Sequence, residues 1–509
     1  MIVPGHVART IFLLAISAAL FKACYKETLL EDPEKWRVSN RVLEFDRVYA
    51  FTDLEEQMLL YTLPSDTILS YSPLVVFGDF ESVEFNGILL KENEENDLGD
   101  VVVNQPYPVI AQRGGISYSY QLYFTNLPQV HIHTETKIRD EPKVSSWLEL
   151  AHAGENGGTR LFTSHAGIEI RGRTSAAYEK KPYGLELWEN KYGDDRSAAL
   201  LGMRYGEDWI LDAMYVDPLR MRNKLSFEIW EKMWDGKSET PFRTFNPGIQ
   251  CEYIELFINQ RYMGLYCLTE RMDENLLTLP AGNSGSEGVL YKAIDWTGGA
   301  TSFKTYNSEP GFSLIWEGWE QVYPDRLPCW EPLAELRKSV VFDEDELFAI
   351  RIDTLLDLTV AAEYYLFTNL ILAHDNIIKN YYLARYPEES QFLLLPWDLE
   401  GSWGITWFGG EDSINDLLEN NLYTRLLELE VNNFNEILES KWEVYRESIF
   451  QEDSLLAPAR HYVDLLNRSG AIERENKRWE TVDLDLDQGL LYFSQWTTQR
   501  LHYLDQIFH

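Results

Sequence analysis

Residues 373–380 read AHDNIIKN, and this stretch decides the fold expected of the chain. A long and mostly apolar helical pattern over 354–373 leads into it, and a strand pattern over 381–386 follows it. A second strand pattern over 392–395 then runs into Asp398. The predicted order is a buried helix, a polar loop, a hairpin and an acidic residue just beyond a strand end.

Three polar residues stand in this framework in an order that protein kinases also use. Kinases place a catalytic base, a metal-binding Asn and a metal-binding Asp along a loop and the hairpin after it. Asp375, Asn380 and Asp398 match these positions in that order. Phosphoryl transfer needs a carboxylate near the attacking hydroxyl and oxygen ligands for Mg²⁺. On spacing alone, the alternative stays open that Asp375 caps a helix or turn and Asp398 pairs with an arginine.

A second acid follows Asp398 two positions later. In an extended segment, residues two apart share a face, so Asp398 and Glu400 are able to share one metal site. The alternatives are that Glu400 supports the site from outside the ligand set, or that it is simply exposed. Gly401 and Gly404 allow the backbone to approach a ligand closely, or they form an ordinary turn.

Several basic residues surround a predicted strand, loop and strand in the middle of the chain. Arg171 and Arg173 end the first strand, and Lys181 precedes the second beside Pro182. Cations on such a loop are typical of a lid over phosphate groups, although an ordinary surface hairpin has the same pattern.

Two further charged residues are candidates for the same site. Arg222 lies on a helix that Asp217-Pro218 is expected to open, because Asp caps helices and Pro suits the first turn. Arg222 and Lys224 cannot face the same way on that helix, so at most one of them points inward. Glu270 ends a predicted hairpin strand, where it would orient a cation or a nucleotide.

The composition narrows the classes of partner. The chain of 509 residues has 82 acidic and 45 basic residues, a formal charge of −37, and 45% hydrophobic residues. So acidic a surface repels nucleic acid and anionic lipid and suits a basic protein partner, while simple solubility explains the charge equally well. The length and apolar content allow more than one domain.

The first residues resemble an export signal. An apolar run over 11–21 is too short to span a bilayer, and it ends at Ala23-Cys24. A small residue before Cys is typical of a lipoprotein signal peptide, so cleavage would leave Cys24 as a lipidated N-terminus. An uncleaved anchor or a plain secretory signal are the alternatives. We therefore expect an exported protein that is anchored at the outer membrane or cell surface, with its lipid as the only membrane contact.

The domain organisation follows from changes in pattern along the chain. We expect a signal peptide at 1–23, a tether at 24–44, a β-sandwich-like module at 45–126 and a mixed α and β domain with a helical C-terminal part at 127–509. His131 and His133 share a strand face, yet no third metal ligand is within sequence reach. Cys251 and Cys267 lie on opposite arms of a predicted hairpin, where free buried thiols are favoured over a disulfide.

Seven separated motifs together resemble the CotH family of spore-coat, kinase-like proteins, over about residues 128–460. The β-rich piece and the lipidation pattern before them resemble exported CotH-like lipoproteins of Bacteroidetes-type bacteria. The motifs are IRGR at 170–173, KKPY at 180–183, DWIL at 208–211, MRNKL at 221–225, GLYCLTER at 264–271, DN at 375–376 with Asn380, and PWDLEGSWG at 396–404.

This resemblance implies an α+β, atypical protein-kinase-like fold that uses ATP and Mg²⁺ or Mn²⁺ to phosphorylate Ser or Thr in a protein. A basic and Ser-rich protein is one candidate substrate. Asp375 matches the catalytic position, and Asn380 and Asp398 match the metal positions. Glu400 stands where the family usually has Asp. The residues that match the basic and nucleotide-binding positions are Lys181, Arg171, Arg173, Arg222 and Glu270.

Two hypotheses of different classes follow. The first is a surface kinase in which Asp375 acts on the hydroxyl group. The second is a catalytically weak or inactive surface lipoprotein that keeps the fold and binds a cation, a glycan or a partner protein. Intact Asp375, Asn380 and Asp398 favour the first, whereas Glu400 and the export signal favour the second.

Overall fold

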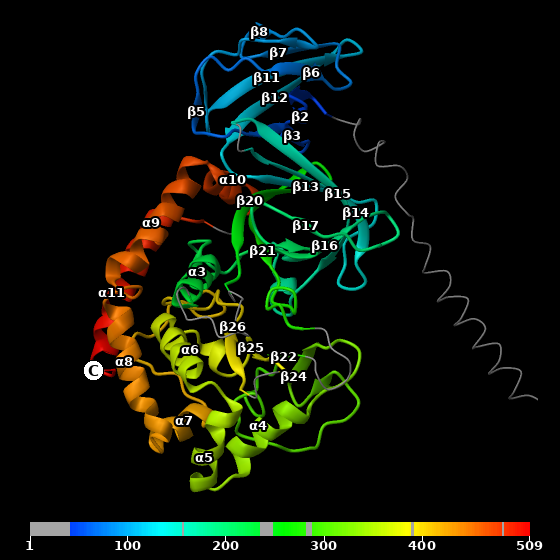
Figure 1. The fold of residues 1–509 in the computed structure, drawn as a ribbon. Helices are drawn as coiled ribbons and strands as arrows, with labels where there is room; N and C mark the ends of the chain where they lie inside the picture. Colours follow the sequence, from blue (N-terminus) through cyan, green and yellow to red (C-terminus); the bar gives the residue numbers. More distant parts are fainter. Residues whose placement is uncertain are drawn as a thin grey trace, which may run out of the picture.

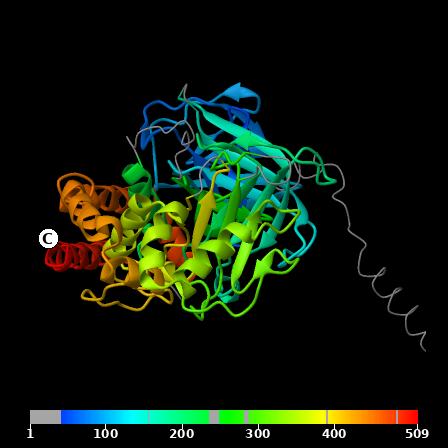
Figure 2. The same cartoon turned by 60° about the horizontal axis from the view of Figure 1, so that its bottom comes forward.

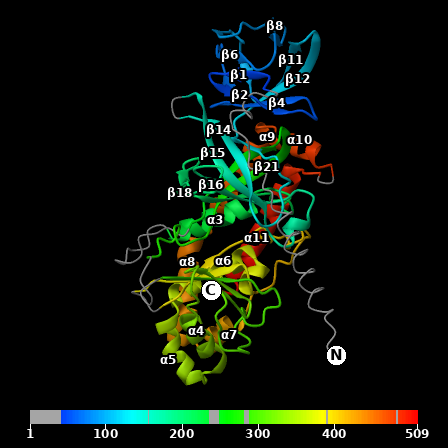
Figure 3. The same cartoon turned by 90° about the vertical axis from the view of Figure 1, so that its right-hand side faces the viewer.

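A computed structural model describes residues 41–154, 157–234, 248–280, 288–387, 391–480 and 483–508. These residues stack in three tiers, which Figures 1 and 3 show from two sides: a β-rich module, a barrel and a helical lobe. The expected signal peptide, Cys24 and most of the expected tether lie outside the described residues. The observed mixture of strands and helices confirms the α+β class.

The first tier, the β-rich module, has its own hydrophobic cluster. Its strands form a six-stranded sheet ordered β3-β4-β12-β11-β7-β8, a four-stranded sheet ordered β2-β1-β6-β9 and the pair β10-β5. Phe257 and Tyr262 of the next tier join its cluster, so the module is seated on the barrel. The strands are β1 (Leu43–Phe45), β2 (Val48–Tyr49), β3 (Phe51–Asp53), β4 (Met58–Thr62), β5 (Thr67–Ile68), β6 (Leu74–Phe77), β7 (Ser82–Phe85), β8 (Ile88–Leu89), β9 (Glu94–Glu95), β10 (Val101–Val102), β11 (Pro106–Arg113) and β12 (Ile116–Thr125).

The second tier is a closed barrel ordered β13-β14-β15-β16-β19-β21-β20. The predicted strands and hairpin of this region are confirmed. Asn259 and Gln260 both have positive φ, 49° and 60°, which is the geometry of a two-residue hairpin turn. The strands are β13 (Gln129–His133), β14 (Val144–Ala153), β15 (Thr159–Ile170), β16 (Tyr183–Trp188), β19 (Asp208–Asp212), β20 (Cys251–Ile258) and β21 (Arg261–Glu270), with the separate short pair β17 (Ala198–Ala199) and β18 (Tyr205–Gly206).

The helix expected from Asp217 begins later than predicted. Helix α3 runs over Arg222–Trp234. Asp217 still organises its start, because the Asp217 carboxylate accepts hydrogen bonds from the backbone N–H groups of Leu219, Met221 and Arg222 at 2.7–2.9 Å. Residues 217–221 therefore form a turn that the Asp217 carboxylate stabilises, and helix α3 begins after this turn.

The third tier, the helical lobe, is built on an antiparallel sheet ordered β23-β24-β22-β25-β26. The predicted hairpin is confirmed as β25 (Tyr381–Arg385) and β26 (Leu393–Pro396). The other strands are β22 (Val289–Ala293), β23 (Ile315–Trp316) and β24 (Trp319–Tyr323). Figure 2 shows helices of this lobe in front of the sheet, with the C-terminal helices along one side.

The long helix expected over 354–373 is largely confirmed as α6, but it begins later than predicted, and residues 354 and 355 end the preceding helix. Helix α5 (Asp345–Leu355) ends before Asp357, whose side chain accepts a hydrogen bond from the Val360 N–H and so caps α6 (Leu358–Ile371). Almost every residue of α6 is buried, as its apolar pattern predicted. The remaining helices are α4 (Glu331–Phe342), α7 (Asn421–Glu428), α8 (Phe434–Arg446), α9 (Glu452–Arg468), α10 (Ala471–Arg478) and α11 (Leu486–Asp505), with 3₁₀ turns at Ser175–Ala177, His374–Ile377 and Val431–Asn433.

The helical C-terminal part is confirmed by α7 to α11. Helices α9 and α10 return alongside the barrel, so the end of the chain ties the tiers together (Figure 1). Among the described residues, no helix is both long and apolar enough to cross a bilayer.

Candidate functional site

A cavity of about 570 Å³ lies between the barrel and the helical lobe, a volume within the usual range of small-molecule sites. The barrel contributes the loop from Arg171 to Pro182, the end of β19 and the segment after it. The helical lobe contributes β22, the 3₁₀ turn after α6 and the segment that follows β26. We call this space the interlobe cavity.

Asp375 reaches the interlobe cavity because α6 stops at Leu372, which has a left-handed φ of 51°. The turn that follows is held by Asn376, whose side-chain amide donates to the backbone carbonyls of Asn380 and Trp397 at 2.7 Å each. The Asp375 carboxylate is paired with Lys379 at 3.0 Å, and Lys379 also lines the cavity. His374 turns away to Asp412, so His374 and Asp375 do not form a dyad.

Asn380 and Asp398 meet across the base of the β25–β26 hairpin. The Asn380 side-chain amide donates to Asp398 Oδ2 at 3.0 Å. Both residues have positive φ, 55° and 57°, a backbone conformation that Asn and Asp tolerate better than most residues. Their residue types therefore suit both the tight backbone and the oxygen ligands that a metal requires.

The acidic side of the interlobe cavity contains Asp398, Glu400 and a third carboxylate, Asp212, at the end of β19. Burial, followed by the charge of Asp212, raises the pKa of Asp398 and holds the pKa of Glu400 well above its usual value. Asn223 joins the two lobes here: its amide donates to Asp212 Oδ2 at 2.9 Å, and its oxygen accepts from the Leu399 N–H at 3.0 Å.

The basic side of the interlobe cavity contains Arg171, Arg173 and Lys292. Burial lowers the pKa of Arg171, and burial together with the charge of Arg171 lowers the pKa of Lys292 to about 8. The Arg171 guanidinium and the Lys292 ammonium both lie over the ring of Trp397, at 5.9 and 5.7 Å from its centre. The charges of Lys292 and Arg171 both act on Asp398, so cations and carboxylates share one cavity, as a phosphate–metal complex requires.

Lys181 is placed differently from its prediction. Its ammonium donates to the backbone carbonyls of Ala176 and Tyr178 at 2.8 and 2.7 Å, so it stiffens the loop and does not line the cavity. Its neighbour Lys180 lines the cavity instead, with its side chain fully buried.

Arg222 and Glu270 require a correction, because neither lines the interlobe cavity. Arg222 is buried and bonded to Asp217 and to the carbonyl of Ser402, so it supports the segment after β26 from behind. Glu270 is buried and accepts from the N–H groups of Arg204 and Gln250. Both side chains are bonded to protein groups outside the cavity lining, so neither is placed to hold a nucleotide.

Three residues of the cavity escaped the sequence analysis: Asp212, Lys292 and Lys379. Lys292 carries no motif of its own, and only the pairing of β22 with β25 places it opposite Tyr382 beside the hairpin. Asp212 directly follows the DWIL motif, so its position at a strand end was the one available signal. Lys379 lies inside the stretch AHDNIIKN, four residues after Asp375.

The donor set of the cavity fits a hard divalent cation. Asp398 and Asn380 are in contact, Glu400 and Asp212 lie on the same side, and all of them offer oxygen atoms, the ligands that Mg²⁺ and Mn²⁺ prefer. Burial and the charge of Asp212 raise the pKa of Asp398 and of Glu400, and a bound cation would favour their charged forms. Asp398 and Asn380, with Glu400 or Asp212, are the residues that would hold the metal.

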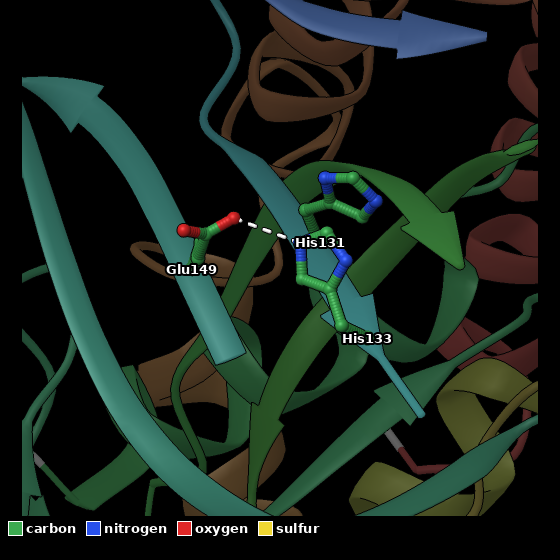
Figure 4. Close-up of side chains that lie close together, drawn as sticks. All are labelled: His131, His133 and Glu149. Atoms are coloured by element: carbon green, nitrogen blue, oxygen red, sulfur yellow. Dashed lines mark hydrogen bonds and ion pairs between the residues drawn. The ribbon is translucent and has the colours of Figure 1, made fainter. Parts of the chain in front are cut away.

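A second polar cluster lies in the barrel wall, outside the interlobe cavity, and consists of His131, His133 and Glu149 (Figure 4). The third member escaped the sequence analysis because Glu149 lies opposite His131 on the neighbouring strand β14. His133 Nε2 lies 2.9 Å from Glu149 Oε2, Arg41 donates to Glu149 Oε1 at 3.1 Å, and His131 Nε2 accepts from the Gln260 N–H at 3.0 Å.

These contacts favour a structural role for the cluster. Burial lowers the pKa of both histidines, that of His133 to about 3, so both rings are neutral at neutral pH. The guanidinium of Arg41 already balances the Glu149 charge, and the Gln260 N–H already uses a ring nitrogen of His131. An added cation would displace these bonds and repel Arg41.

Cys251 and Cys267, on the two arms of the β20–β21 hairpin, are free thiols. Burial raises the pKa of Cys251 to about 12 and that of Cys267 well above its usual value, so neither is a reactive thiolate.

A solved structure of the Shewanella oneidensis MR-1 toxin–antitoxin proteins HipA and HipB with operator DNA is similar over 65% of this chain and 64% of the other, at 13% identity; its TM-score of 0.29 is too low to support an inference. The inner spore coat protein H of Bacillus subtilis (strain 168) is 23% identical over 247 residues, which span 47% of this chain and 58% of that protein.

The family model described as CotH kinase protein matches residues 168–504. This range includes the loop from Arg171, the turn with Asp375 and Asn380, the segment with Asp398 and Glu400, and α10. The chain belongs to the CotH kinase protein family.

Proposed function

We propose that this chain transfers the γ-phosphoryl group of ATP, in the presence of Mg²⁺ or Mn²⁺, to a Ser or Thr hydroxyl of a protein. The observation that carries the proposal is the interlobe cavity, in which Asp375, Asn380 and Asp398 face Arg171 and Lys292. Membership of a kinase-like family supports the same reaction class.

Each residue has a physical task in this reaction. The hydroxyl oxygen attacks the γ-phosphorus, the bond to the bridging β–γ oxygen breaks, and ADP leaves. Asp375 orients the hydroxyl and accepts its proton, while Lys379 keeps the Asp375 carboxylate in place. Arg171 and Lys292 offset the negative charge of the phosphates. Asp398 and Asn380 would hold the metal, which would supply further positive charge to the site.

The substrate and location belong to the same proposal. A formal charge of −37 suits a basic, Ser-rich protein substrate and disfavours nucleic acid. We further propose that Cys24 carries the lipid that anchors the protein at the outer membrane or cell surface. Incorporation of labelled palmitate is then expected in the wild type and absent in Cys24→Ala; labelling that persists in that variant rules out lipidation at Cys24.

The transfer of label from γ-labelled ATP with Mg²⁺ or Mn²⁺ tests the reaction, with the protein itself and a basic Ser-rich protein as acceptors. Wild type is expected to transfer label, and Asp375→Asn to lose at least about 100-fold in rate. The control Asp464→Asn removes an exposed carboxylate of α9 that pairs with Arg468, and it should match wild type.

A wild type that neither transfers label nor binds ATP in a calorimeter would refute the kinase proposal. The alternative function, binding of a cation, glycan or partner protein without transfer, would then stand.

A further inference from the structure

We propose that Glu475, on the C-terminal helix α10, is a positioning residue for the interlobe cavity. It holds two loops that border the cavity on its barrel side: residues 172–182, which carry Lys180, and residues 213–217. This inference rests on the proposed function, since the cavity it shapes is the proposed site of phosphoryl transfer.

The contacts of Glu475 converge from three parts of the barrel. Its Oε1 accepts from Lys180 Nζ at 2.6 Å and from Arg220 Nε at 3.2 Å, and its Oε2 accepts from the Leu265 N–H at 2.8 Å. The side chains of Lys180, Arg220 and Glu475 are all fully buried. Lys180 also donates to the Leu265 carbonyl. Lys180 and Glu475 together therefore bind both the C=O and the N–H group of this residue of β21.

Lys180 and Arg220 each connect Glu475 to a loop that lines the cavity. Lys180 belongs to the loop between β15 and β16, which lines the cavity from Arg171 to Pro182. Arg220 donates to the backbone carbonyls of Met214, Tyr215 and Asp217 at 2.6–2.8 Å. Met214 and Tyr215 line the cavity as well. One carboxylate on α10 therefore fixes both loops relative to β21.

The barrel leaves room for this carboxylate at a single glycine. Gly264 has a φ of 105°, and a Cβ built on it would lie 2.1 Å from Glu475 Oε2. No other residue type fits there without moving Glu475 away. Position 264 of the GLYC segment therefore requires glycine, because α10 approaches the backbone closely at this point.

Helix α10 is also bound to the β-rich module. Arg474 pairs with Glu255 of β20 at 2.8 Å, and Lys477 pairs with Glu56 of the module at 2.5 Å. Displacing α10 from the barrel would break the Glu475 contacts, so the proposed activity depends on how the end of the chain docks.

The test compares Glu475→Gln with the matched control Glu255→Gln. Both remove a buried carboxylate that ties α10 to the barrel, but Glu255 bonds to Arg474 and Tyr262 and has no contact with a cavity loop. Glu475→Gln is expected to raise the KM for ATP about 100-fold, because the loops that border the nucleotide shift. The KM for the protein substrate should change little. Glu255→Gln should lower the melting temperature and leave the KM for ATP unchanged.

Amide hydrogen exchange and a double variant test the positioning role of Glu475 independently of the KM for ATP. Amide hydrogen exchange at 172–182 and 213–217 should speed up in Glu475→Gln and not in Glu255→Gln. If Glu475 holds the 172–182 loop through Lys180, exchange at 172–182 should be no faster in the double variant Glu475→Gln/Lys180→Met than in Lys180→Met alone.

The outcomes separate this inference from the proposed function. A Glu475→Gln protein with the wild-type KM for ATP and wild-type loop protection overturns the positioning role. A wild type without phosphoryl transfer refutes the proposed function, and the exchange experiment still decides whether Glu475 holds the loops.

Discussion

At the scale of single residues, the interlobe cavity contains buried carboxylates and buried cations whose pKa values are shifted toward their neutral forms. Asp398 and Glu400 have raised pKa values, while Lys292 has a pKa lowered to about 8. Both shifts disfavour the charged forms, which is the state expected of a site whose charges are balanced by a bound metal and phosphate.

Lys292 offers the sharpest test at this scale. Lys292→Met is expected to weaken binding of ATP with Mg²⁺ by about 10- to 100-fold, since a charge-assisted contact is worth about 1.5–3 kcal/mol. The measurement is calorimetric titration, with Lys304→Met, an exposed lysine of the same lobe, as control. In wild type, binding should weaken as pH rises through about 8, because Lys292 then loses its charge. Equal affinity of both variants would remove Lys292 from the site.

At the scale of elements, the buried side-chain amide of Asn376 is a central anchor of the turn between α6 and β25. Asn376 reaches two backbone carbonyls, and Tyr364 in turn donates to the Asn376 carbonyl at 2.7 Å. Asp375 and Asn380 lie on either side of this anchor, so their geometry depends on it.

Asn376→Ala is therefore expected to destabilise the protein by about 2–4 kcal/mol, because it removes both hydrogen bonds of the buried amide and takes from the Trp397 carbonyl its Asn376 donor. Urea denaturation measures this change, with the exposed Asn415→Ala as control. Phosphoryl transfer should also fall in the fraction that remains folded. Full stability in Asn376→Ala would show that the turn is held by other contacts.

At the scale of the whole molecule, the two lobes meet at like charges. Asp212 comes from the barrel, and Asp398 and Glu400 come from the helical lobe. The folded pKa values of Asp398 and Glu400 are raised, so between the unfolded and folded values the folded state keeps protons that the unfolded state loses. Stability from these groups therefore falls as pH rises through that window.

A divalent cation should reverse this loss. Mg²⁺ or Mn²⁺ is expected to raise the melting temperature by about 2–4 °C at about pH 8 and by less at about pH 5, because protons compete with the metal for carboxylates whose pKa values are raised. Glu400→Gln should melt higher than wild type without metal and gain less from metal. Scanning fluorimetry with and without chelator measures both, and a metal effect that is equal at the two pH values would contradict the assignment.

The local sequence pattern was sufficient to predict the main helices and strands around the site, and the acidic and amide residues of the site itself. Apolar periodicity predicted the β25–β26 hairpin and the buried helix α6, and the spacing of Asp375, Asn380 and Asp398 placed them on one loop and one strand end. It failed at boundaries that a single side chain sets: Asp217 delays α3, and Asp357 caps α6 later than the predicted start.

Only the tertiary structure decided which cations face those carboxylates. Lys292 replaces Lys181 there, because strand pairing turns Lys292 toward Trp397 while Lys181 finds nearer backbone carbonyls. Asp212, Asn223 and Glu475 join the site from distant parts of the chain through barrel closure and the docking of α10. Local periodicity reports which face a residue occupies, whereas the neighbours on that face are set by contacts between residues far apart in sequence.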